Sequence, residues 1–147
     1  HALGGRAQRW DRGWGLGTIN IKLFDLPDWL EEADFTDNQN QTVNLIHVHQ
    51  DQVIELPAGA RPIGSAFHCK NAAYMISDTV FSFQGHPEFD VPYTEALLSL
   101  LEDRAGRHCV AAARLSLLTP HDGRRVAKWI LKFFARHARP QQKGNCS

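Results

Sequence analysis

The chain has 147 residues, and its 16 basic and 16 acidic side chains give a formal net charge of zero. This balance favours no nucleic-acid partner, and the lack of an apolar run of about 18 residues argues against a membrane span. Cys69, Cys109 and Cys146 have no metal-ligand spacing, and their odd number fits a reducing compartment. We therefore expect a cytoplasmic protein of one domain, or most of one, with neither nucleic acid nor membrane as a partner.

In chain order, the pattern predicts strands first and helices last. A helix end at Gly4-Gly5 and a glycine-rich loop at 13–17 come before the first strand. Strands are expected at 18–24, 43–49, 52–56, 62–67, 73–77 and 79–83, with a short helical piece at 28–33. Helices are expected at 94–104 and from Thr119-Pro120, as N-cap and N1, to about Ala138. The domain would cover 1–139, followed by a disordered tail at 140–147.

The segment from Phe83 to Phe89 carries the clearest chemical signal. It places His86 and Glu88 on either side of Pro87, directly after an apolar strand. Proline favours an extended backbone before it, and residues i and i+2 of an extended segment point to the same side. His86 can therefore act as a base with Glu88 as the carboxylate that orients it. A strand-ending turn with two solvated polar residues is the simpler alternative.

Three further blocks accompany this motif in a fixed order. They are Gly13-Trp14-Gly15-Leu16-Gly17, the run from Val48 through Val53 with Leu56-Pro57-Ala58-Gly59-Ala60, and the run from Ser65 to Ala73. Together with Gly85-His86-Pro87-Glu88, these blocks resemble the class I glutamine amidotransferases. The resemblance runs from His1 to about Tyr93. It is strongest to the domains similar to the GMP synthase glutaminase and to the γ-glutamyl peptidases.

The resemblance implies an α/β fold, a flavodoxin-like open sheet that is N-terminally incomplete. It implies amide hydrolysis by a Cys-His-Glu triad with His86 and Glu88 as two members, acting on glutamine or a γ-glutamyl compound. By the same resemblance Val48, Gln50 and Asp51 are candidates for contacts with the substrate. No cofactor or metal is expected, and the existence of a synthase partner stays open. The family's nucleophilic cysteine would lie roughly eight residues before His1, so we expect the parent protein to be an enzyme and this chain alone to be inactive.

Two alternatives to this interpretation remain. The chain can be a non-catalytic amidotransferase-like module with a binding or regulatory role. In addition, His47, His49 and Asp51 form an H-x-H-x-D pattern that opens some zinc-hydrolase motifs, although Gln52 stands where the next histidine would be and no second histidine cluster is evident. Cys69 precedes Lys70 but lacks the sharp glycine-flanked turn of a nucleophile, which favours a structural cysteine.

Overall fold

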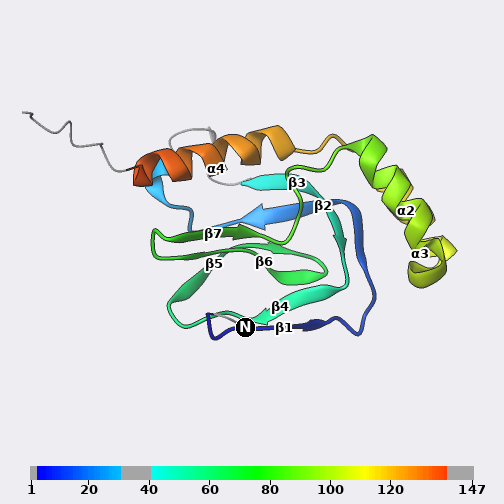
Figure 1. Cartoon of the computed structure of the whole chain (residues 1–147), viewed down its shortest axis with the longest axis horizontal. Coiled ribbons are helices and arrows are strands. Elements are labelled where there is room, and N and C mark those ends of the chain that lie inside the picture. Colours follow the sequence, from blue (N-terminus) through cyan, green and yellow to red (C-terminus); the bar gives the residue numbers. More distant parts are fainter. Residues whose placement is uncertain (1–2, 31–40, 139–147) are drawn as a thin grey trace, which may run out of the picture.

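The computed structural model describes residues 3–30 and 41–138. Its main feature is a five-stranded sheet in the order β3-β2-β5-β6-β7, in which every neighbouring pair is antiparallel (Figure 1). The strands are β2 (Gly15–Leu23), β3 (Thr42–His49), β5 (Ala60–Ala66), β6 (Cys69–Ile76) and β7 (Val80–Phe83). Each of them overlaps a strand that the sequence pattern predicts, because the apolar and β-branched residues of these runs are the ones that the sheet buries.

A second, two-stranded sheet pairs β1 (Arg6–Arg9) with β4 (Asp51–Glu55) in antiparallel register. β4 was predicted, whereas β1 was missed, because its four residues are all exposed and show no apolar alternation. Side chains attach this small sheet to the main one. Asn71 donates to the Val53 carbonyl at 2.9 Å, and the Val53 amide donates to Gln84 Oε1 at 2.8 Å. β4 is thereby tied to β6 and to the end of β7.

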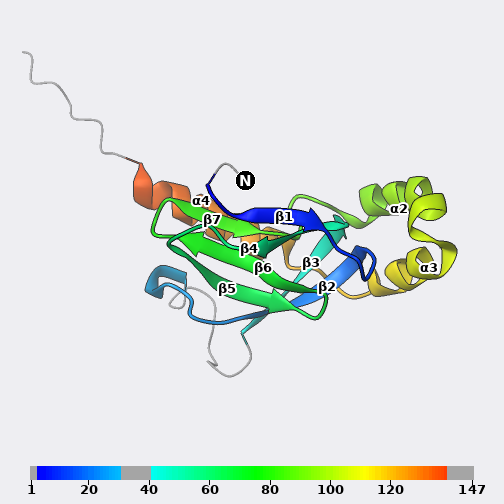
Figure 2. The same cartoon turned by 90° about the horizontal axis from the view of Figure 1, so that it is seen from below.

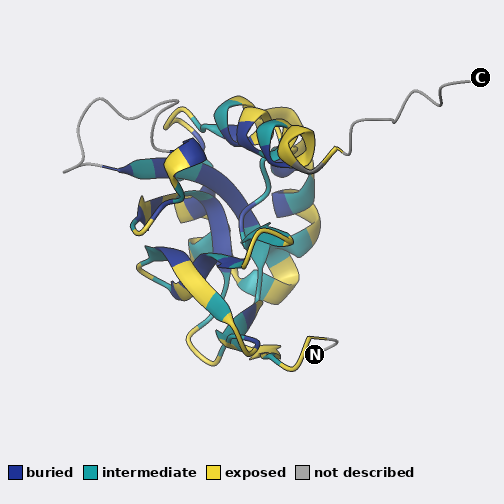
Figure 3. Ribbon diagram, turned by 90° about the vertical axis from the view of Figure 1, so that its left-hand side faces the viewer, coloured by how far each residue is buried: buried dark blue, intermediate teal, exposed yellow. Residues whose placement is uncertain are grey.

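Helix α4 (Gly123–His137) lies along one side of the main sheet (Figure 1). Its apolar face buries Val126, Trp129 and Phe133 against the sheet. Trp29, in a helical turn at 28–30, contacts Phe133 and meets Phe81 edge-on, with ring centroids 6.2 Å and 5.6 Å away. Figure 3 shows the resulting buried layer between helix and strands. Burial of such aromatic and aliphatic side chains stabilises the fold by about 1.5–3 kcal/mol each.

Helices α2 (Val91–Ala105) and α3 (Arg107–Ser116) stand beyond one end of the main sheet (Figures 1 and 2). A second apolar cluster holds them there, with members from β2, β3 and both helices: Leu16, Ile46, Leu98, Val110, Ala113 and Leu117. Gly17 adopts φ +84°, and a Cβ there would overlap Ser116, which accepts a hydrogen bond from the Thr18 amide at 2.9 Å. The close approach of α3 to β2 therefore requires glycine at this position.

The helices confirm the α/β class but correct two details. The sequence analysis missed α3 as a separate helix. The predicted N-cap at Thr119 with Pro120 at N1 is wrong, because α4 begins at Gly123 after Asp122. Asp122 binds β3 instead: its amide donates to the Asn44 carbonyl at 2.7 Å, and its Oδ2 accepts from the Asn44 amide at 2.8 Å. Among the described residues, no helix has the length and apolar composition that crossing a membrane requires. The predicted tail at 140–147 lies outside the described residues.

Candidate functional site

His86 lies directly after β7, where the chain crosses to β3. Its amide donates to the Ile46 carbonyl at 2.7 Å, and the two residues form an isolated antiparallel bridge. One residue earlier, the Gln84 amide donates to the Ala72 carbonyl at 2.8 Å. Because Pro87 has no amide to donate, the segment leaves the sheet at this point. The backbone of His86 is therefore fixed from two strands.

The side chains of His86 and Glu88 meet, as the extended spacing predicts. His86 Nδ1 lies 2.9 Å from Glu88 Oε1. An ionised carboxylate can only accept a hydrogen bond, so Nδ1 carries the proton and Nε2 is the nitrogen free to act as a base. Burial raises the pKa of Glu88, but hydrogen bonds from His86 and from the backbone amide of Glu88, together with the His86 charge, outweigh this effect and lower it.

Aromatic residues and a helix cap support this pair from the other side. The His86 ring stacks on Phe89 with centroids 4.0 Å apart and planes at 6°, and Phe89 meets Tyr93 edge-on at 4.7 Å. Asp90 is the N-cap of α2, and its Oδ1 accepts from the Tyr93 amide at 2.8 Å. The start of α2 therefore fixes the position of the ring on which His86 rests.

The structure places the predicted catalytic and substrate-contact residues in neighbouring but different hollows. His86 and Glu88 line an open cavity of about 290 Å³ together with Phe81, Phe83 and Ile130. The predicted substrate contacts Val48, Gln50 and Asp51 line another open cavity, of about 450 Å³. The other residues that line it are aromatic or basic: Arg9, Trp14, His49 and Arg104. Within the described residues, therefore, the five predicted site residues do not share one cavity.

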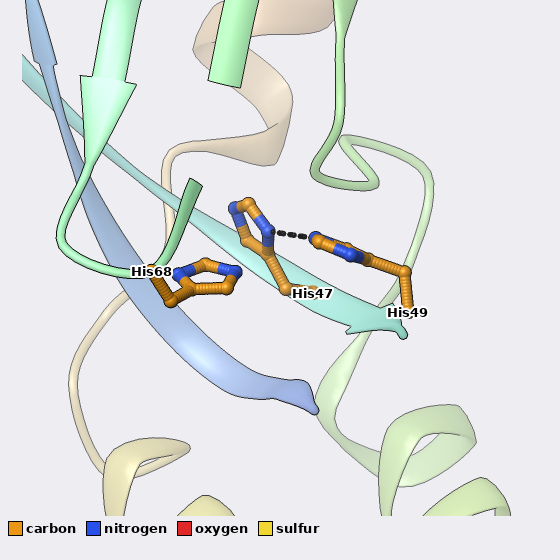
Figure 4. A group of neighbouring side chains, drawn as sticks. All are labelled: His47, His49 and His68. Carbon is orange, nitrogen blue, oxygen red and sulfur yellow. Dashed lines mark hydrogen bonds between the residues drawn. The ribbon is translucent and has the colours of Figure 1, made fainter. Parts of the chain in front are cut away.

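Three further histidines gather beside His86, at the ends of β2 and β3. His47 and His49 project from β3, and His68 comes from the turn between β5 and β6 (Figure 4). His47 Nδ1 lies 2.9 Å from His49 Nε2, and the three ring centroids lie 5.1–5.3 Å from one another. We call these residues the histidine cluster. Sequence reasoning paired His47 with His49 but missed His68, which has no pattern linking it to β3.

The histidine cluster is neutral at physiological pH. Burial, and then the charges of His49, His68 and His86, lower the pKa of His47 to about 2. Burial and the neighbouring His68 lower the pKa of His49 to about 4, against an opposing effect of Asp51. Burial also lowers the pKa of His68. A buried imidazolium would have to lose its hydration, so these rings resist protonation.

Cys69 has the environment of a structural cysteine. It is fully buried, and burial raises the pKa of its thiol to about 11. A thiol, rather than the reactive thiolate, is therefore present at neutral pH. Its sulfur lies 3.9 Å from Gln84 Oε1, and it belongs to the core under α4.

No protein-family model matches this chain. The known proteins that are similar to it include a γ-glutamyl peptidase and a candidate glutamine amidotransferase. The chain is 32% identical over 99 residues to γ-glutamyl peptidase 2 of Arabidopsis thaliana, covering 67% of this chain and 38% of that protein. It is 31% identical over 103 residues to a candidate glutamine amidotransferase of Saccharomyces cerevisiae, covering 70% of this chain and 38% of that protein. The matched region thus spans well under half the length of either relative.

A solved structure shares the fold. A glutamine amidotransferase from Methylobacillus flagellatus superposes with a TM-score of 0.65 at 19% sequence identity, covering 92% of this chain and 57% of that one. At this level of identity the likeness concerns the arrangement of strands and helices alone.

Proposed function

We propose that this chain, which belongs to the class I glutamine amidotransferases, supplies the histidine and the glutamate of a Cys-His-Glu triad that hydrolyses a glutamine side chain or a γ-glutamyl bond. The observation that carries the proposal is the contact of 2.9 Å between His86 Nδ1 and Glu88 Oε1, at a backbone position held by β3 and α2. The carboxylate fixes the tautomer and the orientation of the ring, so that Nε2 faces the reaction as a base.

The cysteine of this triad would come from residues outside the chain. Within the described residues, Cys69 is buried in the core and Cys109 packs in the cluster between α2 and α3. Neither of these environments is that of an activated thiolate beside a base. The parent protein would place its nucleophile near His86 Nε2.

The proposed chemistry balances with water as the only co-reactant. His86 takes the proton of the cysteine thiol, and the resulting thiolate attacks the amide carbon. The C–N bond then breaks as protonated His86 gives this proton to the departing ammonia or amine. His86 then removes a proton from water, which attacks the thioester. The C–S bond breaks, the thiol is restored, and the product is a free γ-carboxylate. Val48, Gln50 and Asp51 would contact the amino-acid end of the substrate from the neighbouring cavity.

The test uses the parent protein with its complete amidotransferase domain. His86→Ala should abolish the release of ammonia from glutamine and of amine from a γ-glutamyl dipeptide, while His108→Ala, on an exposed position of α3, should leave both rates unchanged. Turnover by His86→Ala at the wild-type rate would remove this residue from the mechanism. Comparing the two substrates also separates glutaminase from γ-glutamyl peptidase activity.

A further inference from the structure

We propose that the histidine cluster of His47, His49 and His68 is a binding site for a divalent transition metal, with zinc as the best fit. One ring nitrogen from each histidine lies within 4.8 Å of those of the other two. Around tetrahedral zinc, nitrogens bound at about 2.0–2.1 Å lie about 3.3 Å apart. Small rotations of the rings would bring the cluster to that geometry. This site is separate from the triad and does not depend on the proposed function.

Glycine at position 15 lets the rings of His68 and His49 pack closely against β2. Gly15 lies opposite His49 in the register of β2 and β3. A Cβ at Gly15 would overlap His68 Nε2 and would lie 3.1 Å from His49 Nε2. These two nitrogens therefore both lie against the backbone of Gly15. With His47 Nδ1, which lies 2.9 Å from His49 Nε2, they identify the three donor atoms.

The hydrogen bonding of the cluster is incomplete without a metal. His68 Nε2 is buried and has no partner among the described residues. A buried polar atom left without a partner costs about 1–3 kcal/mol. Coordination would give His68 Nε2 a partner and would replace the single contact between His47 and His49 by two bonds to the metal. Coordination would thus satisfy one of the three unpaired ring nitrogens, the other two being His47 Nε2 and His49 Nδ1, which face away from the proposed donors.

The chemistry of the donors favours zinc over magnesium or calcium. Imidazole nitrogen suits Zn²⁺, Cu²⁺ and Ni²⁺, whereas Mg²⁺ and Ca²⁺ prefer oxygen. The metal-binding form of histidine is the neutral ring, which offers one nitrogen to the metal. The three donors leave a fourth position for water. His49 also lines the open cavity of about 450 Å³, which gives the site a route to solvent.

The sequence pattern and the structure suggest different sets of metal ligands. The H-x-H-x-D pattern suggested His47, His49 and Asp51 as ligands, and the absence of a second histidine cluster argued against a metal. In the structure the third donor is His68, 19 residues further along the chain than His49. Asp51 instead acts on His49, raising its pKa through a backbone contact and through its charge. Asp51 would not bind the metal itself but would orient the His49 imidazole that does.

The experiment is a zinc titration of the untagged 147-residue chain by calorimetry, with metal content after dialysis measured by mass spectrometry. We expect one zinc per chain and a rise in the thermal unfolding midpoint, because a ligand that binds only the folded state stabilises it. His68→Ala should weaken zinc binding by at least about 100-fold. Replacing zinc with Co²⁺ should give the visible absorption of a four-coordinate ion rather than of a six-coordinate one.

Two variants keep the result interpretable. His108→Ala removes an exposed histidine from α3 and should bind zinc as the wild type does. Gly15→Ala keeps all three histidines, but its methyl group would overlap the His68 ring and force that ring away from His49, so this variant should lose the zinc while retaining the helical circular dichroism. Equal zinc affinity in wild type and His68→Ala, or no zinc bound by the folded wild type, would overturn the proposal.

Discussion

The His86–Glu88 pair and the histidine cluster are neighbouring regions that differ in burial and in hydrogen bonding. The pair is partly exposed, with 33% and 63% of the two side chains accessible, and its hydrogen bond is complete. The cluster is largely buried, and several of its ring nitrogens have no partner. A base must exchange protons with solvent and substrate, whereas a metal site needs deprotonated donors fixed around an empty centre. Under the two proposals above, one residue type would serve two chemistries according to its burial.

The two regions are also in direct contact through the residues next to them in the chain. Position 85 between them is glycine, and a Cβ there would lie 2.7 Å from His47 Nε2. The next residue, His86, pairs through its backbone with Ile46, which precedes His47 on β3. The cluster is therefore in direct contact with the segment that carries His86.

The largest expected effect concerns the pair acting as one unit. In the parent protein, we expect His86→Ala to lower kcat by about 10⁶-fold and Glu88→Gln by about 10⁴-fold, since the carboxylate only orients the base. The double variant should be no slower than His86→Ala, because the two residues act through one proton transfer. Steady-state kinetics on glutamine measures all three. Additive losses in the double variant would mean that Glu88 acts independently of His86.

The second effect is a pH dependence of stability caused by His47. Its pKa falls from an ordinary 6.5 to about 2 on folding, so only the unfolded chain binds this proton between those values. The stabilisation is fully present above pH 6.5 and is lost as the pH falls. At pH 5 it has decreased by about 2 kcal/mol. His49 and His68, whose pKa values are also lowered, act in the same direction.

Urea denaturation of the chain with a chelator present, at pH 7.5 and at pH 5, measures this dependence. His47→Gln should show a smaller loss of unfolding free energy on acidification than the wild type. His108→Gln, which changes an exposed histidine, should retain the full loss. An identical pH dependence in the wild type and His47→Gln would show that His47 is not the buried neutral group described above.

The smallest effect tests the support of the pair by α2. Asp90→Ala removes the acceptor of the Tyr93 amide and should lower the free energy of unfolding by about 1 kcal/mol. Asp103→Ala, near the other end of α2, has no cap to lose and is the matched control. In the parent protein the Asp90 variant should also lose some turnover, because Tyr93 packs on the ring that stacks on His86. Equal stability of both variants would contradict the capping role.

Sequence reasoning succeeded where a local rule determines the structure. His86 and Glu88 meet because extended residues i and i+2 share a side, and the strands follow from their apolar runs. It failed where contacts between segments far apart in the sequence determine the structure. His68 reaches the cluster through the pairing of β5 with β6, and Asp122 replaces Thr119 before α4 because it binds Asn44 on β3. The separate helix α3 begins after Gly106, whose φ of +87° is a change of direction that helical periodicity does not reveal.

The most direct test of the difference between the two regions is nuclear magnetic resonance of the imidazole nitrogens in the ¹⁵N-labelled chain, with and without zinc. We predict that zinc shifts the ring nitrogens of His47, His49 and His68. His86 should keep its proton on Nδ1, hydrogen-bonded to Glu88, and its ring should not coordinate the ion. Zinc coordination by His86, or a zinc titration that leaves the three cluster histidines unshifted, would contradict the division of the four histidines into a base and a metal site.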